Sequence, residues 1–211
     1  MGLRYQDRKQ AGAVLAQQLQ KYAGRANVLV LALPRGGVPV AYSIAQALNA
    51  PLDLCLVRKL GVPGQEELAL GAVAVGGARV FNEDVIAALD LDDRKIEAVT
   101  TEAEHELQRR LRAYRGDRPQ PNLSDRVIIL VDDGLATGAT MRAAVEALRS
   151  QNPAWLCVAV PVGSPEAVAA LHSRVDDLVC PLVPQDLMAV GRWYDDFTQT
   201  TDEEVRALLA G

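Results

Sequence analysis

Two adjacent carboxylates stand just before a turn rich in glycine and threonine. Asp132 and Asp133 close an apolar run, and the segment 134–140 (GLATGAT) follows them. Such a turn at the start of a helix presents backbone N–H groups and hydroxyls, and the aligned peptide dipoles there favour an anion. The carboxylates lie a few residues upstream, within reach of sugar hydroxyls on the same ligand. This segment therefore predicts binding of a phosphorylated sugar.

Two commoner phosphate motifs do not fit. Small residues at Ala136, Gly138 and Ala139 allow a phosphate close to the backbone. A P-loop, however, needs a lysine directly before its serine or threonine, and here Ala139 stands directly before Thr140. A dinucleotide-binding fingerprint needs Gly-x-Gly-x-x-Gly after the first strand, and the segment 34–37 (PRGG) does not supply it. The sequence thus argues against both an NTPase and a dehydrogenase.

Composition limits the class of protein further. The chain has 211 residues, of which 49% are hydrophobic and 23% charged, typical of one globular domain with additional segments. Its net charge of −5 argues against a protein that coats nucleic acid. Three cysteines in separate apolar runs and two histidines favour free thiols over a Cys/His zinc site. A polar start and the lack of any apolar run of about 18 residues predict no membrane span and a cytoplasmic location.

The elements that must position these residues alternate between strands and helices. Apolar runs predict strands, and helical spacing or capping residues predict helices. Expected strands are 27–33, 52–57, 126–131, 154–160 and 175–182, and expected helices are 7–24, 38–48, 92–114, 141–149 and two short ones opening at Ser164 and Thr201. This alternation predicts an α/β fold with a mainly parallel central sheet flanked by helices.

Ligands of such sheets bind beyond the carboxyl ends of the strands. The loops that fall there are 34–37, 58–67 and 132–140. Glycine and proline punctuation predicts that 60–67 (LGVPGQEE) is a mobile loop. The runs 71–75 and 78–81, separated by Gly76 and Gly77, predict a short β-hairpin.

The run VIILVDDGLATGAT resembles the phosphoribosyl pyrophosphate signature of type I phosphoribosyltransferases. The resemblance extends over the whole chain in order: a pyrophosphate loop after the first core strand (LPRGG), a flexible loop, this signature and a C-terminal hood. ALPRGGVPVA and VRKLGVPGQEELALGAVAVGG are further similar to a bacterial phosphoribosyltransferase-like subfamily of undefined acceptor, stand-alone or fused to hydrolase-type domains. The resemblance implies one domain, 1–211, with a core of about 1–182 and a hood of about 183–211 to which the N-terminus contributes.

The resemblance also implies roles for individual residues. Asp132 and Asp133 would bind ribose hydroxyls, 137–140 would cradle the 5′-phosphate, and 34–37, with a cis peptide at Pro34–Arg35, would bind pyrophosphate. Implied catalytic residues are Arg35, Lys59, Asp132 and Asp133. Implied substrate-binding residues are Pro34, Gly36, Gly37, Arg58, Gly134, Ala136, Thr137, Gly138, Ala139, Thr140, Trp193 and Asp195. Arg58 and Lys59 equally suit a solvated strand end.

The implied reaction transfers a phosphoribosyl group from phosphoribosyl pyrophosphate to a nitrogenous base or another small acceptor, with release of pyrophosphate. Mg²⁺ is the implied cofactor, held mainly through ligand or water by Asp132 and Asp133, with Asp195 as a further candidate. The implied partners are the two substrates and, in a homodimer, a second copy of the chain; nucleic acid and membranes are not expected.

Three positions depart from purine-salvage members of the family. Ala136 replaces an acidic residue near the base, Pro161 and Val162 stand where a lysine reads a purine carbonyl, and Met188 replaces a stacking aromatic. Trp193, Tyr194 and Phe197 offer other rings, which would either stack on the acceptor or pack the hood. These departures argue against ordinary purine salvage. They leave a second hypothesis open, a non-catalytic regulatory protein that binds phosphoribosyl pyrophosphate or a nucleotide.

Overall fold

Five parallel strands form the central sheet of this computed structural model, which describes residues 4–62, 65–74, 77–89 and 91–211. The strand order is β2-β1-β6-β7-β8, and every pair is parallel. The strands are β1 (Val28–Ala32), β2 (Leu52–Leu54), β6 (Val127–Val131), β7 (Trp155–Ala159) and β8 (Asp177–Val179). Every residue of β1 and β6 is buried, as unbroken apolar runs predict for strands that are covered on both faces.

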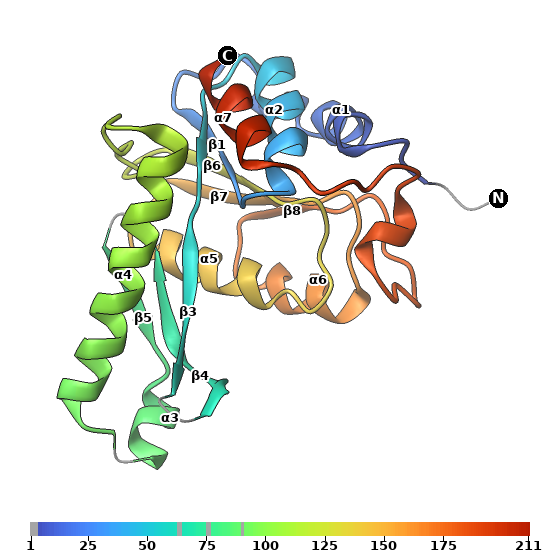
Figure 1. Cartoon of the computed structure of the whole chain (residues 1–211). Coiled ribbons are helices and arrows are strands. Elements are labelled where there is room, and N and C mark those ends of the chain that lie inside the picture. Colours follow the sequence, from blue (N-terminus) through green and yellow to red (C-terminus); the bar gives the residue numbers. More distant parts are fainter. Residues whose placement is uncertain (1–3, 63–64, 75–76, 90) are drawn as a thin grey trace.

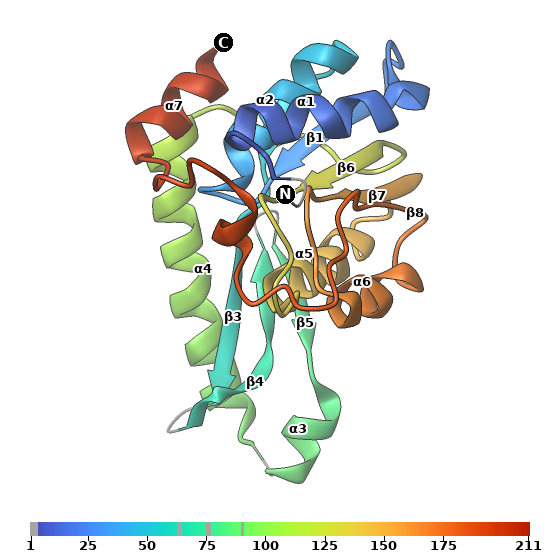
Figure 2. The ribbon, with the colours of Figure 1, turned by 90° about the vertical axis from the view of Figure 1, so that its right-hand side faces the viewer.

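Helices cover both faces of this sheet (Figures 1 and 2). Val28 and Val30 pack with α1 (Arg8–Gln18), α2 (Gly37–Leu48) and α7 (Asp202–Ala210). The alternate residues Leu29 and Leu31 pack with α5 (Ala139–Arg149) and α6 (Pro165–His172) on the opposite face. The expected α/β fold with a mainly parallel sheet is confirmed. No helix within the described ranges is long and apolar enough to cross a bilayer.

A separate antiparallel sheet projects from this core. Its strands, in the order β3-β4-β5, are β3 (Val57–Val62), β4 (Gln65–Ala74) and β5 (Ala78–Phe81). Together with α3 (Glu83–Ala88) and α4 (Asp93–Arg115) they form what we call the arm, which extends away from the parallel sheet (Figures 1 and 2). Leu60 and Val73 are buried in one apolar cluster with Leu107 of α4, while Ala74 and Ala78 cluster with Ala147 of α5.

The arm corrects the expectation of a mobile loop at 60–67. Leu60 pairs with Gly71 and Gly61 with Ala69, so most of this segment belongs to β3 and β4. Burial of Leu60 and Val62 offsets the local effect of glycine and proline. Residues 63 and 64 lie outside the described ranges, as do Val75 and Gly76 of the expected hairpin, whose β4–β5 pairing is present.

The C-terminal segment contacts both the N-terminus and the core. Tyr5 forms a parallel bridge with Tyr194, next to the 3-10 helix Val190–Trp193. The expected capping box of Thr201 and Glu204 is present at the start of α7. This last helix packs against α2 and α4. The hood segment is thus tied to the chain at several separate points.

Candidate functional site

The signature turn (134–140) joins the carboxyl end of β6 to α5. Gly138 adopts a left-handed conformation (φ 71°), and its carbonyl accepts the N–H of Arg142 at 2.8 Å. Among the described residues, the N–H groups of Gly138, Thr140 and Met141 have no acceptor. These donors at a helix start can bind an anion, as the sequence predicts.

The loop after β7 holds the signature turn in place. Leu135 donates its N–H to the carbonyl of Val162 at 2.8 Å, and Ser164 donates its N–H to the carbonyl of Leu135 at 2.9 Å. The Ser164 hydroxyl also donates to the carbonyl of Ala136 at 2.8 Å. The free donors of the turn are therefore positioned by backbone contacts between neighbouring strand ends.

The loop 34–37 lies directly against the paired carboxylates (Asp132 and Asp133). A Cβ on Gly36 would lie 1.9 Å from Oδ2 of Asp133, and one on Gly37 would lie 2.7 Å from the carbonyl oxygen of Val131. Only glycine fits at this approach. The Pro34–Arg35 peptide is cis, as expected. Gly37 donates its N–H to Leu33 at 3.1 Å, so it contributes close packing and not a free donor.

The two carboxylates have different partners. Oδ1 of Asp132 accepts the N–H of Asp133 at 2.8 Å. Oδ2 of Asp133 accepts from Nε of Arg8 at 2.9 Å and lies 2.8 Å from a second nitrogen of the same guanidinium. Burial, and then the charge of Asp133, raises the pKa of Asp132 well above its ordinary value. Burial also raises the pKa of Asp133, and Arg8 opposes that rise.

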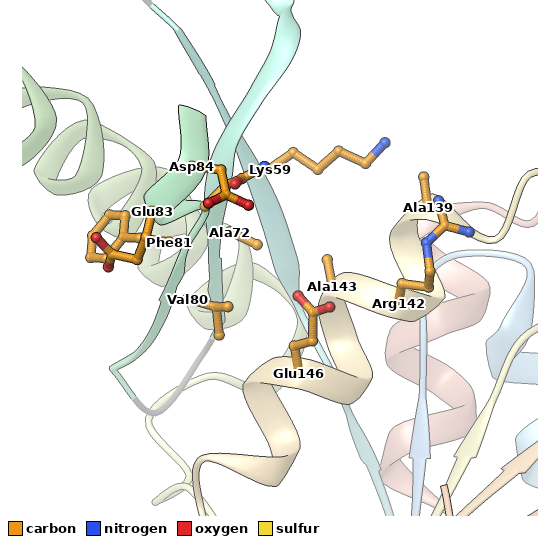
Figure 3. Close-up of a pocket in the computed structure, with 12 residues that line it drawn as sticks. Lys59, Ala72, Val80, Phe81, Glu83, Asp84, Ala139, Arg142, Ala143 and Glu146 are labelled. Carbon is orange, nitrogen blue, oxygen red and sulfur yellow. The ribbon is translucent and has the colours of Figure 1, made fainter. Parts of the chain in front are cut away.

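The predicted cations lie around this centre to different extents. Arg35 is 3.6 Å from Oδ1 of Asp202, and because this pair is partly exposed it contributes little to stability. Lys59 projects from β3 toward Ala139 and Arg142 of α5 (Figure 3). Arg58 precedes it on the strand and points to the opposite face, where its charge acts on Glu106 of α4. The structure brings Lys59, and not Arg58, toward the signature turn.

The hood packs on the signature from the other side. The Tyr194 hydroxyl donates to the carbonyl of Asp133 at 2.6 Å, and a Cβ on Gly134 would lie 2.3 Å from a methyl carbon of Val190. Trp193 donates its indole N–H to Leu187 at 3.3 Å. Asp195 is exposed and donates its backbone N–H to Tyr5 at 2.8 Å. Of the three hood aromatics (Trp193, Tyr194 and Phe197), Tyr194 is the one that donates a hydrogen bond to the backbone of the paired carboxylates.

Two hollows flank the first turn of α5. One, of about 560 Å³, is lined by Ala136, Thr137, Ser164, Glu166 and Met188, among others. The other, of about 570 Å³, lies between α5 and the arm (Figure 3). Trp193 lines neither of them but a third hollow of about 300 Å³ beyond Met188. The structure therefore places Met188, and not Trp193, beside the signature turn.

The donor set suits a cation that arrives with its ligand. The described residues contain no group of three or more His, Cys, Asp or Glu side chains able to hold a metal ion. Oδ1 of Asp132 is bound by the N–H of Asp133, and Oδ2 of Asp133 is bound by Arg8. Mg²⁺ coordinated by oxygens of a diphosphate and by water fits this arrangement.

Comparison with known proteins decides the family. The sequence model of the phosphoribosyl transferase domain matches residues 3–184. The chain belongs to the phosphoribosyl transferase family.

Relatives of this phosphoribosyl transferase domain include proteins from two strains of Mycobacterium tuberculosis, provisionally named phosphoribosyl transferases. Each is 46% identical over 205 residues, which is 97% of this chain and 46% of the relative. The chain thus spans about half the length of these curated relatives.

Solved structures agree on the fold. A Thermus thermophilus protein superposes with a TM-score of 0.87 at 44% identity, covering 98% of this chain and 97% of the other. A hypoxanthine phosphoribosyltransferase from Staphylococcus aureus gives a TM-score of 0.50 at 12% identity, covering 88% and 78%. This second likeness concerns the fold alone.

Sequence reasoning missed two contacts of this phosphoribosyl transferase domain. Arg8 is far from Asp133 in the chain, and no local motif connects them. Ser164 is identifiable as a helix cap, but its bond to Ala136 depends on how the strand ends meet. Both contacts join segments that become neighbours only through the parallel sheet.

Proposed function

We propose that this domain binds phosphoribosyl pyrophosphate with Mg²⁺ and transfers its phosphoribosyl group to a small nitrogenous acceptor. The observation that carries the proposal is one junction at the strand ends. There the loop 34–37 contacts the paired carboxylates, and the signature turn with its free N–H groups follows them directly in the chain. Each part suits one portion of a phosphorylated sugar diphosphate.

The ligand's parts are assigned by chemistry. The N–H groups of Gly138, Thr140 and Met141, with the hydroxyls of Thr137 and Thr140, would bind the 5′-phosphate. The free oxygens of Asp132 and Asp133 would accept hydrogen bonds from ribose hydroxyls. Arg35 would bind the pyrophosphate in place of Asp202, since their long, partly exposed ion pair is easily exchanged.

In the proposed reaction, a nitrogen of the acceptor forms a bond to the anomeric carbon of the ribose. The carbon–oxygen bond to pyrophosphate breaks, the electron pair leaves with pyrophosphate, and the acceptor nitrogen releases a proton. Arg35 and Lys59 would stabilise the negative charge that grows on the leaving group. Bound Mg²⁺ would supply further charge neutralisation on the diphosphate.

The hollow of about 560 Å³ beside the signature turn supports a small acceptor. Its lining combines apolar side chains, among them Leu187 and Met188, with the polar side chains of Thr137, Arg142, Ser164 and Glu166. Ala136 offers no carboxylate, and the strand end at Pro161 and Val162 offers no ammonium group, so the usual partners of a purine edge are missing. We therefore propose a nitrogenous base or another small acceptor without assigning it to purine salvage. The homodimer and the cytoplasmic location stay predictions.

Isothermal titration of the protein with phosphoribosyl pyrophosphate and Mg²⁺ tests the binding step. We expect saturable binding that Asp133→Asn weakens roughly tenfold or more, because a hydrogen bond to a charged group is lost. Asp117→Asn, at an exposed site, is the control and should leave binding unchanged. Equal affinity of Asp133→Asn and the parent would remove this carboxylate from the proposed ribose site.

A further inference from the structure

A buried arginine ties the N-terminal helix to the paired carboxylates. Arg8 opens α1 and is 9% exposed. Its Nε donates to Oδ2 of Asp133 at 2.9 Å, a second nitrogen lies 2.8 Å from that oxygen, and the third donates to the carbonyl of Thr198 at 2.7 Å. The guanidinium also lies 3.9 Å from the ring centroid of Phe197. All three nitrogens are engaged, so Arg8 is not a solvated surface side chain.

The contact leaves one oxygen of Asp133 for a ligand. Both Arg8 nitrogens contact Oδ2, so a ligand would engage Oδ1. The charged and titratable groups that face Asp133 are Arg8 from α1, Asp132 beside it and Tyr194 from the hood. Arg8 alone among these three brings positive charge.

Fold stability by itself does not account for this pair. Desolvating a guanidinium and a carboxylate costs several kcal/mol, and apolar side chains of similar size often hold two elements together equally well. A cation at this position does something that an apolar side chain cannot do. Its two nitrogens contact one oxygen of Asp133 and so fix the direction in which the other oxygen points.

We propose that Arg8 is a positioning residue for the ribose site, holding the carboxylate of Asp133 in one orientation and linking that orientation to the hood. The inference rests on the proposed function, because it assigns Asp133 to ribose hydroxyls. The link to the hood follows from the shared guanidinium: a shift of Thr198 or Phe197 also shifts a contact of Arg8, and with it Asp133.

The test compares the affinity for phosphoribosyl pyrophosphate with the affinity for inorganic pyrophosphate, both measured by calorimetry with Mg²⁺. Arg8→Gln leaves the carboxylate of Asp133 without its two-nitrogen contact, so the affinity for phosphoribosyl pyrophosphate should fall roughly tenfold or more. The affinity for pyrophosphate, which has no ribose, should stay at the parental value. Arg8→Lys keeps the charge but offers a single nitrogen, so it should restore only part of the affinity for phosphoribosyl pyrophosphate. Lys9→Gln, the exposed next residue with the same change in charge, should match the parent.

Thermal melting of each variant separates positioning from folding. A purely structural Arg8 would lower the melting temperature of Arg8→Gln while leaving both affinities unchanged or weakening them equally, and either result would overturn the inference. If Arg8→Gln does not fold, Arg8→Lys decides. Weaker binding of phosphoribosyl pyrophosphate with parental binding of pyrophosphate supports the inference, and any other pattern overturns it. Failure of the unaltered protein to bind the ligand would instead overturn the proposed function, and this inference with it.

Discussion

Asp132 and Asp133 are neighbours in sequence, yet the structure gives them different surroundings. Asp133 faces the guanidinium of Arg8, while Asp132 faces a backbone N–H and the charge of its neighbour. Arg8 approaches from a separate helix and stands 125 positions away from Asp133 in the chain. The two carboxylates therefore owe their different surroundings to the fold, not to the local motif.

The ionised carboxylate of Asp132 lowers the stability of the folded protein, and the uncharged side chain of asparagine would remove this destabilisation. Its pKa is raised in the folded protein by burial and by Asp133, so the folded state binds a proton more tightly than the unfolded state. Stability from this group is full below its ordinary pKa and is lost as pH rises through the folded pKa. Asp132→Asn should therefore raise the free energy of unfolding at neutral pH, and should raise it less near the ordinary pKa of an aspartate, at about pH 4.

Denaturant unfolding at both pH values measures this effect, with exposed Asp117→Asn as control. The same Asp132→Asn protein should bind phosphoribosyl pyrophosphate more weakly. A variant that is less stable than the parent at neutral pH would show that the cost assigned to Asp132 is wrong.

Gly37 tests the close approach of the two loops. A Cβ there would meet the carbonyl oxygen of Val131 at 2.7 Å and the Cα of Asp132 at 2.9 Å, both backbone atoms. Gly37→Ala should destabilise the protein by about 1–3 kcal/mol and weaken ligand binding, because the backbone of the carboxylates must move. Denaturant unfolding and calorimetry measure the two effects.

The matched control is Gly116→Ala, where a Cβ would have no atom within 4 Å but φ is 62°. It should cost about 1–3 kcal/mol through backbone strain, because φ 62° with ψ −142° suits glycine alone, and leave binding unchanged. Parental binding by Gly37→Ala would contradict the proposed steric role.

At the scale of elements, strand β3 of the arm decides which cation points toward the signature turn. Side chains alternate along β3, so adjacent residues Arg58 and Lys59 face α4 and α5 respectively. The sequence predicted positive charge at this strand end but treated both residues alike. It also gave 60–67 as a loop, because local glycine and proline signals do not report burial against a helix that follows about 30 residues later in the chain.

Lys59→Gln and Arg58→Gln therefore form a matched pair. Lys59→Gln should reduce affinity for pyrophosphate or phosphoribosyl pyrophosphate roughly tenfold, since it removes a cation directed at the ligand. Arg58→Gln removes the same charge from the opposite face and should change affinity little. Competition of pyrophosphate against labelled phosphoribosyl pyrophosphate gives both affinities. Equal losses of affinity in the two variants would contradict the conclusion that only Lys59 faces the ligand.

At the scale of the whole molecule, the parallel sheet gathers the site from segments spread through the chain. The parallel sheet could be predicted because buried strands and helices alternate regularly along the chain. Its five strands lie within or close to the five segments that the sequence predicts as strands. The β4–β5 hairpin of the second sheet could also be predicted, but β3 could not, because its pairing with β4 goes with burial of Leu60 and Val62 in the long-range packing of the arm. The resemblance implied an N-terminal contribution to the hood, but not the Tyr5–Tyr194 bridge itself.

A ligand that engages several elements should stabilise the entire domain. Phosphoribosyl pyrophosphate with Mg²⁺ at 100 times its dissociation constant should add about 2.7 kcal/mol to the free energy of unfolding. Thermal melting would then shift upward by several degrees, with a smaller shift for ribose 5-phosphate at equal concentration, because it lacks contacts to the loop 34–37. Identical shifts for the two ligands would contradict a pyrophosphate site in that loop.

Release of pyrophosphate tests the central claim most directly. The protein is incubated with phosphoribosyl pyrophosphate, Mg²⁺ and a panel of nucleobases and other small nitrogenous acceptors, and pyrophosphate is followed over time. We predict acceptor-dependent release that Arg35→Ala reduces strongly. Clear binding of phosphoribosyl pyrophosphate without release for any acceptor would contradict transfer and favour a non-catalytic regulatory protein.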